Sequence, residues 1–257
     1  MVFTDAKESS FYSRCVKRFL LDARPASPNE ITEFGSGDAV MMARYLASSR
    51  YPGVIRGYEI NRESYLRARK TIKDAGVSSR YIVKQADFFA TRHDRRGALI
   101  VNPPYLPAPA PRLPMPALWG GREGTRVVKR LLDLGFDQLM MLVASISDPI
   151  GVIRHALQRS YRVVDFSVIT LPFGNYTLEP IVFHQIQRLA RRGKALVRSA
   201  DYQVAGVHFR KTVDGAPDRS QRLLEQMTRW CGHERLVEAR PRRGDGRPRS
   251  AIRTTGS

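Results

Sequence analysis

The sequence predicts an α/β domain in which a mostly parallel sheet carries helices on both faces. From Ile31 onward, short apolar runs alternate with segments of helical spacing, an order that is typical of βαβ units. One apolar run stops at Pro103 and Pro104, as expected where a central strand ends, because proline cannot continue a hydrogen-bonded ladder. With 257 residues, the chain is long enough to bury one core of this kind.

Apolar runs bounded by turn residues predict seven strands, which cover 31–34, 54–60, 81–83, 98–101, 138–144, 161–171 and 202–211. Helical spacing predicts helices over 41–49, 62–75, 122–134, 149–159, 180–192 and 218–231. Before the first strand, Ser9 or Ser10 is expected to cap an amphipathic helix. The apolar side of that helix carries Phe11, Cys15, Phe19 and Leu20.

These elements predict one main domain with short additions at both ends. We expect an N-terminal helix within 1–28, the α/β domain over 29–214 and a terminal helix within 215–239. A loop and helix around 172–194 are expected as an insertion between the last two strands. Residues 240–257 contain six Arg and one Asp with several Gly and Pro, which predicts a basic disordered tail.

The composition favours a cytoplasmic protein without metal chemistry. The first ten residues lack the pattern of a secretory signal, and the apolar stretch 139–146 is too short to span a bilayer. Cys15 and Cys231 lie far apart and outside any C-x-x-C pattern, so we expect two small buried residues and no disulfide. The five histidines show no metal-binding spacing.

The chain is strongly basic, with 43 Lys and Arg against 24 Asp and Glu and a formal net charge of +19. Part of the excess lies in the tail, and the rest includes basic clusters at 92–96 and 188–194. A field of this sign favours a polyanion such as nucleic acid, gripped through the tail, or an acidic protein surface. A solvated face that serves only solubility explains the charge equally well.

A glycine-rich turn, EFGSGDA at 33–39, lies where the first strand passes into a helix. Gly35 and Gly37 allow a ligand to approach the backbone outside the carboxyl ends of the strands, where open α/β sheets bind cofactors. Glu59 ends the next strand, and an acid there can accept hydrogen bonds from both ribose hydroxyls of an adenosine cofactor. Val40 stands where the dinucleotide fingerprint has its third glycine, which disfavours NAD.

Two further strand ends carry residues suited to a site. In ADFF at 86–89, Asp87 can hold an adenine amine while a neighbouring aromatic covers the ring; alternatively, the segment is a turn followed by core phenylalanines. In NPPY at 102–105, the prolines fix the loop so that the Asn102 side chain and nearby carbonyls can accept hydrogen bonds from a planar NH₂ group. Tyr105 offers a face on which such a group can stack. Such groups suit methyl transfer from a sulfonium to this nitrogen. That reaction is a direct displacement, so catalysis consists mainly of holding the nitrogen in line with the bond that breaks.

The order EFGSG, GYEIN, ADFF and NPPY resembles the class I S-adenosylmethionine-dependent methyltransferases of the amino-methylating group. The resemblance implies a Rossmann-like, mostly parallel seven-stranded sheet whose last strand is antiparallel. Within that group, NPPYLPAP and ALWGGREGTRVVKRLL are most similar to HemK-like glutamine methyltransferases of translation release factors. The similarity covers about 31–144. It implies cofactor contacts by Glu33, Gly35, Gly37, Glu59, Asp87, Phe88 and Asn102, and a target nitrogen facing Asn102, Pro103 and Tyr105.

The sequence departs from the family in ways that concern the substrate. Ala39 stands in place of the family's third glycine, and only about one helix precedes Ile31, where bacterial enzymes that modify release factors carry a substrate domain. We therefore expect substrate contacts from Trp119 in the loop after NPPY, and from Tyr176 and Glu179 in the insertion. A surface loop without a role in binding is the alternative for the insertion.

Three substrates remain open at this point. The closest motif match favours a glutamine amide of a translation-related protein, and the charge favours adenine in RNA or DNA. The insertion favours an amine, amide or guanidine of a small molecule held in a compact pocket. A non-catalytic binding module is disfavoured, because binding alone requires neither Asn102 nor Tyr105.

Overall fold

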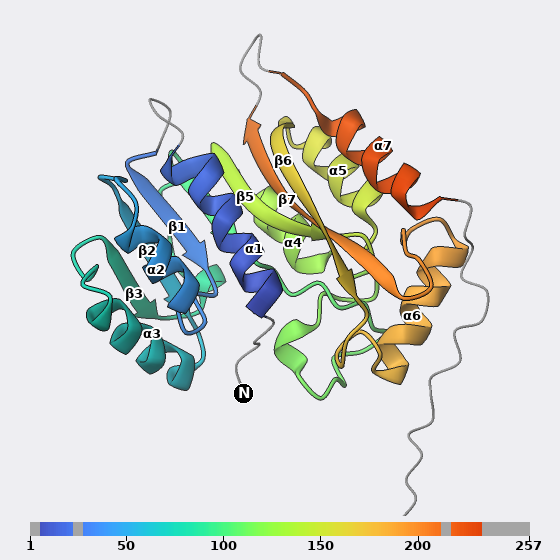
Figure 1. Ribbon diagram of the computed structural model, residues 1–257, viewed down its shortest axis with the longest axis horizontal. Coiled ribbons are helices and arrows are strands. Elements are labelled where there is room, and N and C mark those ends of the chain that lie inside the picture. Colours follow the sequence, from blue (N-terminus) through green and yellow to red (C-terminus); the bar gives the residue numbers. More distant parts are fainter. Residues whose placement is uncertain (1–5, 23–27, 212–216, 233–257) are drawn as a thin grey trace, which may run out of the picture.

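The computed structural model describes residues 6–22, 28–211 and 217–232. Its centre is a seven-stranded sheet in the order β3-β2-β1-β4-β5-β7-β6, shown in Figure 1. The strands are β1 Glu30–Phe34, β2 Val54–Glu59, β3 Tyr81–Gln85, β4 Ala98–Val101, β5 Gln138–Ala144, β6 Tyr161–Pro172 and β7 Asp201–Lys211. Strands β1 to β5 are paired in parallel, and β7 runs antiparallel to both β5 and β6. The predicted fold class is confirmed.

The main helices cover the sheet, and all but the first and last of them connect strands. They are α1 Ala6–Val16, α2 Val40–Ala47, α3 Arg62–Asp74, α4 Arg126–Asp133, α5 Pro149–Gln158, α6 Pro180–Arg191 and α7 Ser220–Cys231. Short helical turns cover η1 Lys17–Leu21, η2 Phe88–Ala90 and η3 Pro116–Leu118. Local signals start several of them: the Asn61 side chain accepts from Ser64 N at 2.9 Å at the start of α3, and Asp148 accepts from Gly151 N at 3.0 Å at the start of α5. Within the described ranges, no helix has both the length and the apolar character needed to cross a bilayer.

The core has two parts, one on each face of the sheet. Strand β5 shows why: Met140, Leu142 and Ala144 belong to one buried cluster, while Leu139, Met141 and Val143 belong to the other. Such continuous burial is typical of a central strand covered on both faces. The first cluster includes apolar residues of α1, α2, α3 and α6, and the second includes those of α4, α5 and α7.

The N-terminal helix begins earlier than the sequence predicts. Neither Ser9 nor Ser10 caps it: α1 begins at Ala6, and the Ser13 hydroxyl donates to Ser9 O inside the helix at 3.0 Å. The expected apolar side is buried, but Glu8 in the first turn is buried with it. This shift matters because it brings a carboxylate of α1 onto the sheet.

Two other expectations need correction. The helix expected over 122–134 begins only at Arg126, because Gly121 and Gly124 have φ of +93° and +74° and keep the preceding segment in a loop. Cys231 is half-buried and its thiol donates to Val197 O at 3.3 Å, whereas Cys15 is buried as expected. The tail expected over 240–257 lies outside the described residues.

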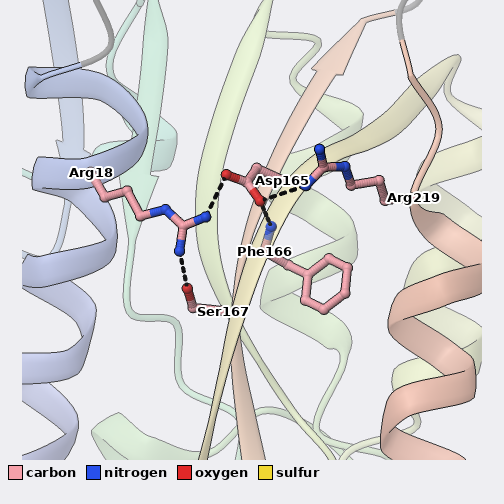
Figure 2. A network of polar contacts seen from close by, with 5 residues as sticks. All are labelled: Arg18, Asp165, Phe166, Ser167 and Arg219. Atoms are coloured by element: carbon pink, nitrogen blue, oxygen red, sulfur yellow. Dashed lines mark hydrogen bonds and ion pairs between the residues drawn. The ribbon is translucent and has the colours of Figure 1, made fainter.

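Both ends of the described chain are tied to strand β6. Asp165 of β6 accepts from Arg18 of η1 at 2.9 Å and from Arg219, just before α7, at 3.1 Å. Figure 2 shows these two contacts. Arg18 also donates to the Ser167 hydroxyl at 3.0 Å. These contacts hold the carboxyl end of the α1–η1 segment against β6, which helps to fix where its amino end lies.

Candidate active site

The candidate site lies where the direction of strand connection reverses. Strands β1 and β4 are parallel neighbours with Phe34 opposite Val101, so their carboxyl ends lie side by side. The chain continues from β1 to one flank of the sheet and from β4 to the other. In open α/β sheets, ligands bind in the crevice at this position. The glycine-rich turn after β1 and the NPPY segment after β4 therefore meet at one edge.

The glycine-rich turn has left-handed backbone at three positions. Gly35 and Gly37 have φ of +70° and +57°, and a side chain placed at either would find no atom within 4 Å. The space in front of the turn is therefore open to a ligand. Ala39 also has a positive φ of +59° and immediately precedes α2. An L residue adopts this conformation only at a cost.

Glu59 links the end of β2 to the glycine-rich turn. Its Oε2 accepts from Gly37 N at 2.9 Å, and its Oε1 accepts from Asn61 N at 2.8 Å. Although Glu59 is buried, its carboxylate has a hydrogen-bond donor on each oxygen. A ribose at this position would meet an acid that the backbone already holds in place.

The Glu33 side chain lies deeper in the protein than a residue that contacts a ligand needs to lie. Only 3% of its surface is exposed, and the Tyr81 hydroxyl donates a hydrogen bond to its Oε2. Burial raises the pKa of Glu33 to about 7, partly offset by that hydrogen bond and reinforced by the nearby Glu59 carboxylate. The Tyr12 hydroxyl of α1 is also buried and has no partner among the described residues. Glu33 thus supports the turn from beneath.

Asp87 and Phe88 have different surroundings. Asp87 is exposed and caps η2 by accepting from Phe89 N at 2.9 Å. Phe88 is only 4% exposed, and its ring stacks on His93 at a centroid distance of 4.1 Å and meets Phe34 edge-on at 5.1 Å. The structure therefore favours a core role for Phe88. The half-buried ring of Phe89, with the Arg130 guanidinium 3.6 Å from its centroid, is the more accessible aromatic.

Asn102 and Tyr105 are joined to a residue that the sequence does not single out. Asn102 Nδ2 donates to Glu8 Oε1 at 2.8 Å, and the Tyr105 hydroxyl donates to Glu8 Oε2. Glu8 is 1% exposed. Asn102 Oδ1 is also buried and has no partner within the described part of the chain. Burial, and then the Glu8 carboxylate, raises the pKa of Tyr105 well above its ordinary value, so the hydroxyl keeps its proton.

The GGREG segment holds the NPPY loop through its backbone. A Cβ at Gly124 would lie 2.3 Å from Tyr105 O and 2.5 Å from the Ser147 hydroxyl, and one at Gly120 would lie 2.8 Å from Pro104 O. The Ser147 hydroxyl donates to Tyr105 O at 2.5 Å. The glycines are therefore needed because two stretches of backbone pass in contact. Pro103 of the same segment is buried.

The insertion and the loop after NPPY reach the site indirectly. Trp119 is half-buried, its Nε1 donates to Ala108 O at 3.0 Å, and the Arg126 guanidinium lies 5.4 Å from its ring centroid. Tyr176 is half-buried against the first core cluster, and Glu179 immediately precedes α6. In α6, Gln185 Nε2 donates to Arg122 O at 2.6 Å, so the inserted helix supports the GGREG segment.

A series of neighbouring aromatic side chains also connects the insertion with NPPY. Phe173, at the start of the insertion, packs on Tyr202 with 5.7 Å between ring centroids. The Tyr202 hydroxyl lies 3.4 Å from that of Tyr105. Sequence reasoning missed both Tyr202 and Glu8. Glu8 did carry a signal, because it lies three, four and seven residues before Phe11, Tyr12 and Cys15 and so shares their apolar side.

Comparisons with known proteins find similarity at the level of the fold. No family model and no curated protein sequence matches the chain. Among solved structures, TYW2 from M. jannaschii, in complex with AdoMet, has a TM-score of 0.51 at 11% identity, with 82% of this chain and 79% of that chain covered. The M1A22 tRNA methyltransferase TrmK from B. subtilis has a TM-score of 0.44 at 13% identity, covering 82% and 67%. The METTL16 methyltransferase domain has a TM-score of 0.46 at 11% identity, covering 79% and 83%.

Proposed function

We propose that this protein transfers a methyl group from S-adenosylmethionine to the nitrogen of a planar NH₂ group. The observation that carries the proposal is the amide of Asn102, whose oxygen is buried without a partner among the described residues at the edge where the open glycine-rich turn lies. A buried acceptor left unpaired is costly, and a substrate N–H would satisfy it. The adjacent turn provides the space that a cofactor needs.

The residues at the other strand ends fit S-adenosylmethionine. We assign the open side of Gly35 and Gly37 to its amino-acid end, the Glu59 carboxylate to the ribose hydroxyls, and the exposed Asp87 to the adenine amine. When bound, the cofactor supplies an electrophilic methyl group on a sulfonium. The AdoMet complex of the similarly folded TYW2 supports this choice of ligand.

Asn102 and Tyr105 are assigned to the methyl acceptor. Asn102 Oδ1, and backbone carbonyls of the proline-fixed loop, accept the N–H groups of the acceptor and so direct its nitrogen. Tyr105 is held by three contacts: its hydroxyl donates to Glu8, its carbonyl accepts from Ser147, and Tyr202 lies beside it. Rigid placement of this kind is what a displacement reaction demands, since the nitrogen must lie in line with the bond that breaks.

For the substrate, we propose a glutamine side-chain amide of a translation-related protein. The support is the GGREG segment, which resembles that of HemK-like enzymes and whose glycines here press against NPPY. Trp119, Tyr176 and Glu179 remain our candidates for contacts beyond the amide. Adenine in RNA or DNA is the second candidate, favoured by the net charge of +19.

Cofactor binding is tested first, by calorimetry with S-adenosylhomocysteine. We expect wild type to bind and Glu59→Ala to lose about tenfold or more in affinity, because two ribose hydrogen bonds to a carboxylate are removed. Glu63→Ala, which removes an exposed carboxylate at the start of α3, is the matched control and should bind as wild type does. Absence of wild-type binding would refute the proposal.

Methyl transfer is tested with labelled S-adenosylmethionine against four separate acceptors: a release factor, total RNA, DNA and a metabolite extract. Label on the release factor supports the glutamine amide, and label on nucleic acid supports adenine instead. On whichever acceptor is labelled, Asn102→Ala should reduce the rate by at least about a hundredfold, as is typical for loss of a group that positions the reacting atom. Full activity in that variant would show that NPPY does not bind the acceptor.

A further inference from the structure

A buried carboxylate, Glu8, contacts both polar side chains of the NPPY segment. We propose that Glu8 is a positioning residue that holds the Asn102 amide in the orientation that leaves its oxygen to accept the substrate N–H. This inference rests on the proposed methyl transfer and adds a residue from outside the 31–144 region that resembles known enzymes. The contacts join residues 94 and 97 positions apart in the chain.

Packing alone does not explain a glutamate at this position. The neighbours of Glu8 on the buried side of α1 are Phe11, Tyr12 and Cys15, so an apolar side chain would fill the space. A buried carboxylate is costly unless hydrogen bonds compensate for its lost hydration. Here Asn102 and Tyr105 each donate to one of its oxygens. These two hydrogen bonds of the Glu8 carboxyl group are therefore made with the site and not with the apolar neighbours of the helix.

The chemistry of the two groups fixes the amide orientation. Both oxygens of the Glu8 carboxyl group act as acceptors here, whereas an amide has a donating NH₂ end and an accepting oxygen end. Asn102 must therefore turn Nδ2 toward Glu8, and Oδ1 is left without a partner among the described residues. Without Glu8, nothing in this pair of contacts would prevent a half-turn of the amide that presents its NH₂ end to the substrate. That orientation would repel a substrate N–H.

The same hydrogen bond strengthens Asn102 as an acceptor. When an amide N–H donates a hydrogen bond, electron density shifts toward its oxygen, and linked hydrogen bonds in a buried site reinforce one another. Glu8 also holds the Tyr105 hydroxyl, so one carboxylate fixes both ends of NPPY. The Tyr202 hydroxyl, 3.4 Å from that of Tyr105, joins this buried cluster.

Helix α1 is anchored firmly enough to act as a support. A Cβ at Gly206 of β7 would lie 2.5 Å from Cys15 Sγ, so the helix passes close against the strand. One end of the α1–η1 segment is tied by Arg18 to Asp165, as Figure 2 shows. These contacts hold α1 against the sheet, and Glu8 lies in the first turn of that helix.

The first test is a double-mutant cycle on the labelled acceptor, with kcat and KM measured for each protein. We expect Glu8→Ala to lower kcat about tenfold or more while KM for S-adenosylmethionine changes by less than about twofold. Glu8→Gln, whose amide oxygen can still accept from Asn102 Nδ2, should recover kcat to within about threefold of wild type. Adding Glu8→Ala to Asn102→Ala should cost less than about a further twofold, because the residue through which Glu8 acts is already absent.

Losses that simply multiply in the double variant would overturn the proposal. A Glu8→Gln variant that is as impaired as Glu8→Ala would also overturn the proposal. If Glu8 acts by accepting a hydrogen bond from Asn102, another acceptor at this position must restore activity. Glu63→Ala serves as the control for removal of a helix-start carboxylate, and thermal unfolding of each variant separates a lost support from a lost fold.

The second test needs no acceptor. In protein labelled with ¹⁵N at asparagine side chains, the Asn102 NH₂ signals should show slow hydrogen exchange in wild type and in Glu8→Gln, and fast exchange with shifted resonances in Glu8→Ala. If wild type transfers no methyl group, the proposed function fails, and this measurement then decides the role of Glu8 alone. Asn102 signals that are identical in wild type and Glu8→Ala would refute it.

Discussion

Replacing Glu33 with glutamine should change how the stability of the protein depends on pH. Glu33 is buried beneath the glycine-rich turn, and burial raises its pKa from 4.5 to about 7. Below pH 4.5, the carboxyl is protonated in both folded and unfolded chains, so it contributes no difference. As the pH rises toward 7, the unfolded chain loses this proton while the folded chain keeps it, and stability falls.

The size of the effect follows from the pKa difference. Each unit is worth about 1.4 kcal/mol, so a rise from 4.5 to about 7 corresponds to about 3 kcal/mol lost once the pH exceeds both values. Between about pH 5 and pH 8, most of this loss should be seen, roughly 2–3 kcal/mol. Glutamine does not titrate and can still accept the Tyr81 hydroxyl hydrogen bond, so the variant should lack the loss.

A second buried group makes the comparison with wild type essential. Burial lowers the pKa of His208 from 6.5 to about 4, so its contribution to stability is present above pH 6.5 and is lost as the pH falls toward 4. The slopes of Glu33 and His208 oppose each other between about pH 4.5 and 6.5 and mask one another in wild type. In Glu33→Gln, the opposing slope of Glu33 is removed and the His208 slope remains.

The assay is urea unfolding of wild type and Glu33→Gln at several pH values. We expect the free energy of unfolding of the variant, relative to wild type, to rise by roughly 2–3 kcal/mol from pH 5 to pH 8 with an unchanged dependence on urea. Glu63→Gln, which replaces an exposed carboxylate, should track wild type throughout. A difference between Glu33→Gln and wild type that stays constant across this range would refute the reasoning.

Three further substitutions test other parts of the fold. Gly124→Ala should destabilise by about 3 kcal/mol or more in thermal unfolding, because its Cβ would overlap the NPPY backbone; a change below about 0.5 kcal/mol would show that this contact yields easily. Phe88→Leu should destabilise by about 1–2 kcal/mol yet keep its affinity for S-adenosylhomocysteine, whereas a tenfold weaker affinity would place the ring against the cofactor. Asp165→Asn should cost about 1 kcal/mol at low salt and less at high salt, and an effect independent of salt would exclude an ionic role for the Arg18 and Arg219 contacts.

The main elements could be predicted from sequence because each leaves a local pattern. The apolar run before Pro103 gives β4, and Asn61 and Gly76 bound α3 within a residue or two of its ends. Parallel strands expose their carboxyl ends at one edge, so Gly35, Glu59 and Asn102 could be assigned to one edge from spacing alone. Local patterns misplaced the start of α1, where two serines resemble a cap but lie inside the helix.

Residues whose roles depend on distant partners could not be assigned in this way. The burial of Phe88 depends on rings of Phe34, Tyr58 and His93, which come from three other segments. The same ADFF sequence would fit two arrangements. In one, Phe88 is a core residue and Phe89 is more accessible; in the other, the Phe88 ring covers a ligand. Periodicity does not separate these arrangements, because a turn of three residues has too few positions to define a face.

The sequence by itself determined the α/β class and which residues follow the carboxyl end of each strand. It also indicated that the Asn102 amide can accept hydrogen bonds from a planar NH₂ group. Only the tertiary structure decided what surrounds that amide. In the sequence, Glu8 is a single acidic residue in a short helix. Its role becomes visible when α1 packs across the sheet and places Glu8 Oε1 2.8 Å from Asn102 Nδ2. A hydrogen bond between residues 94 positions apart is set by how helix and sheet pack, and no local propensity encodes it.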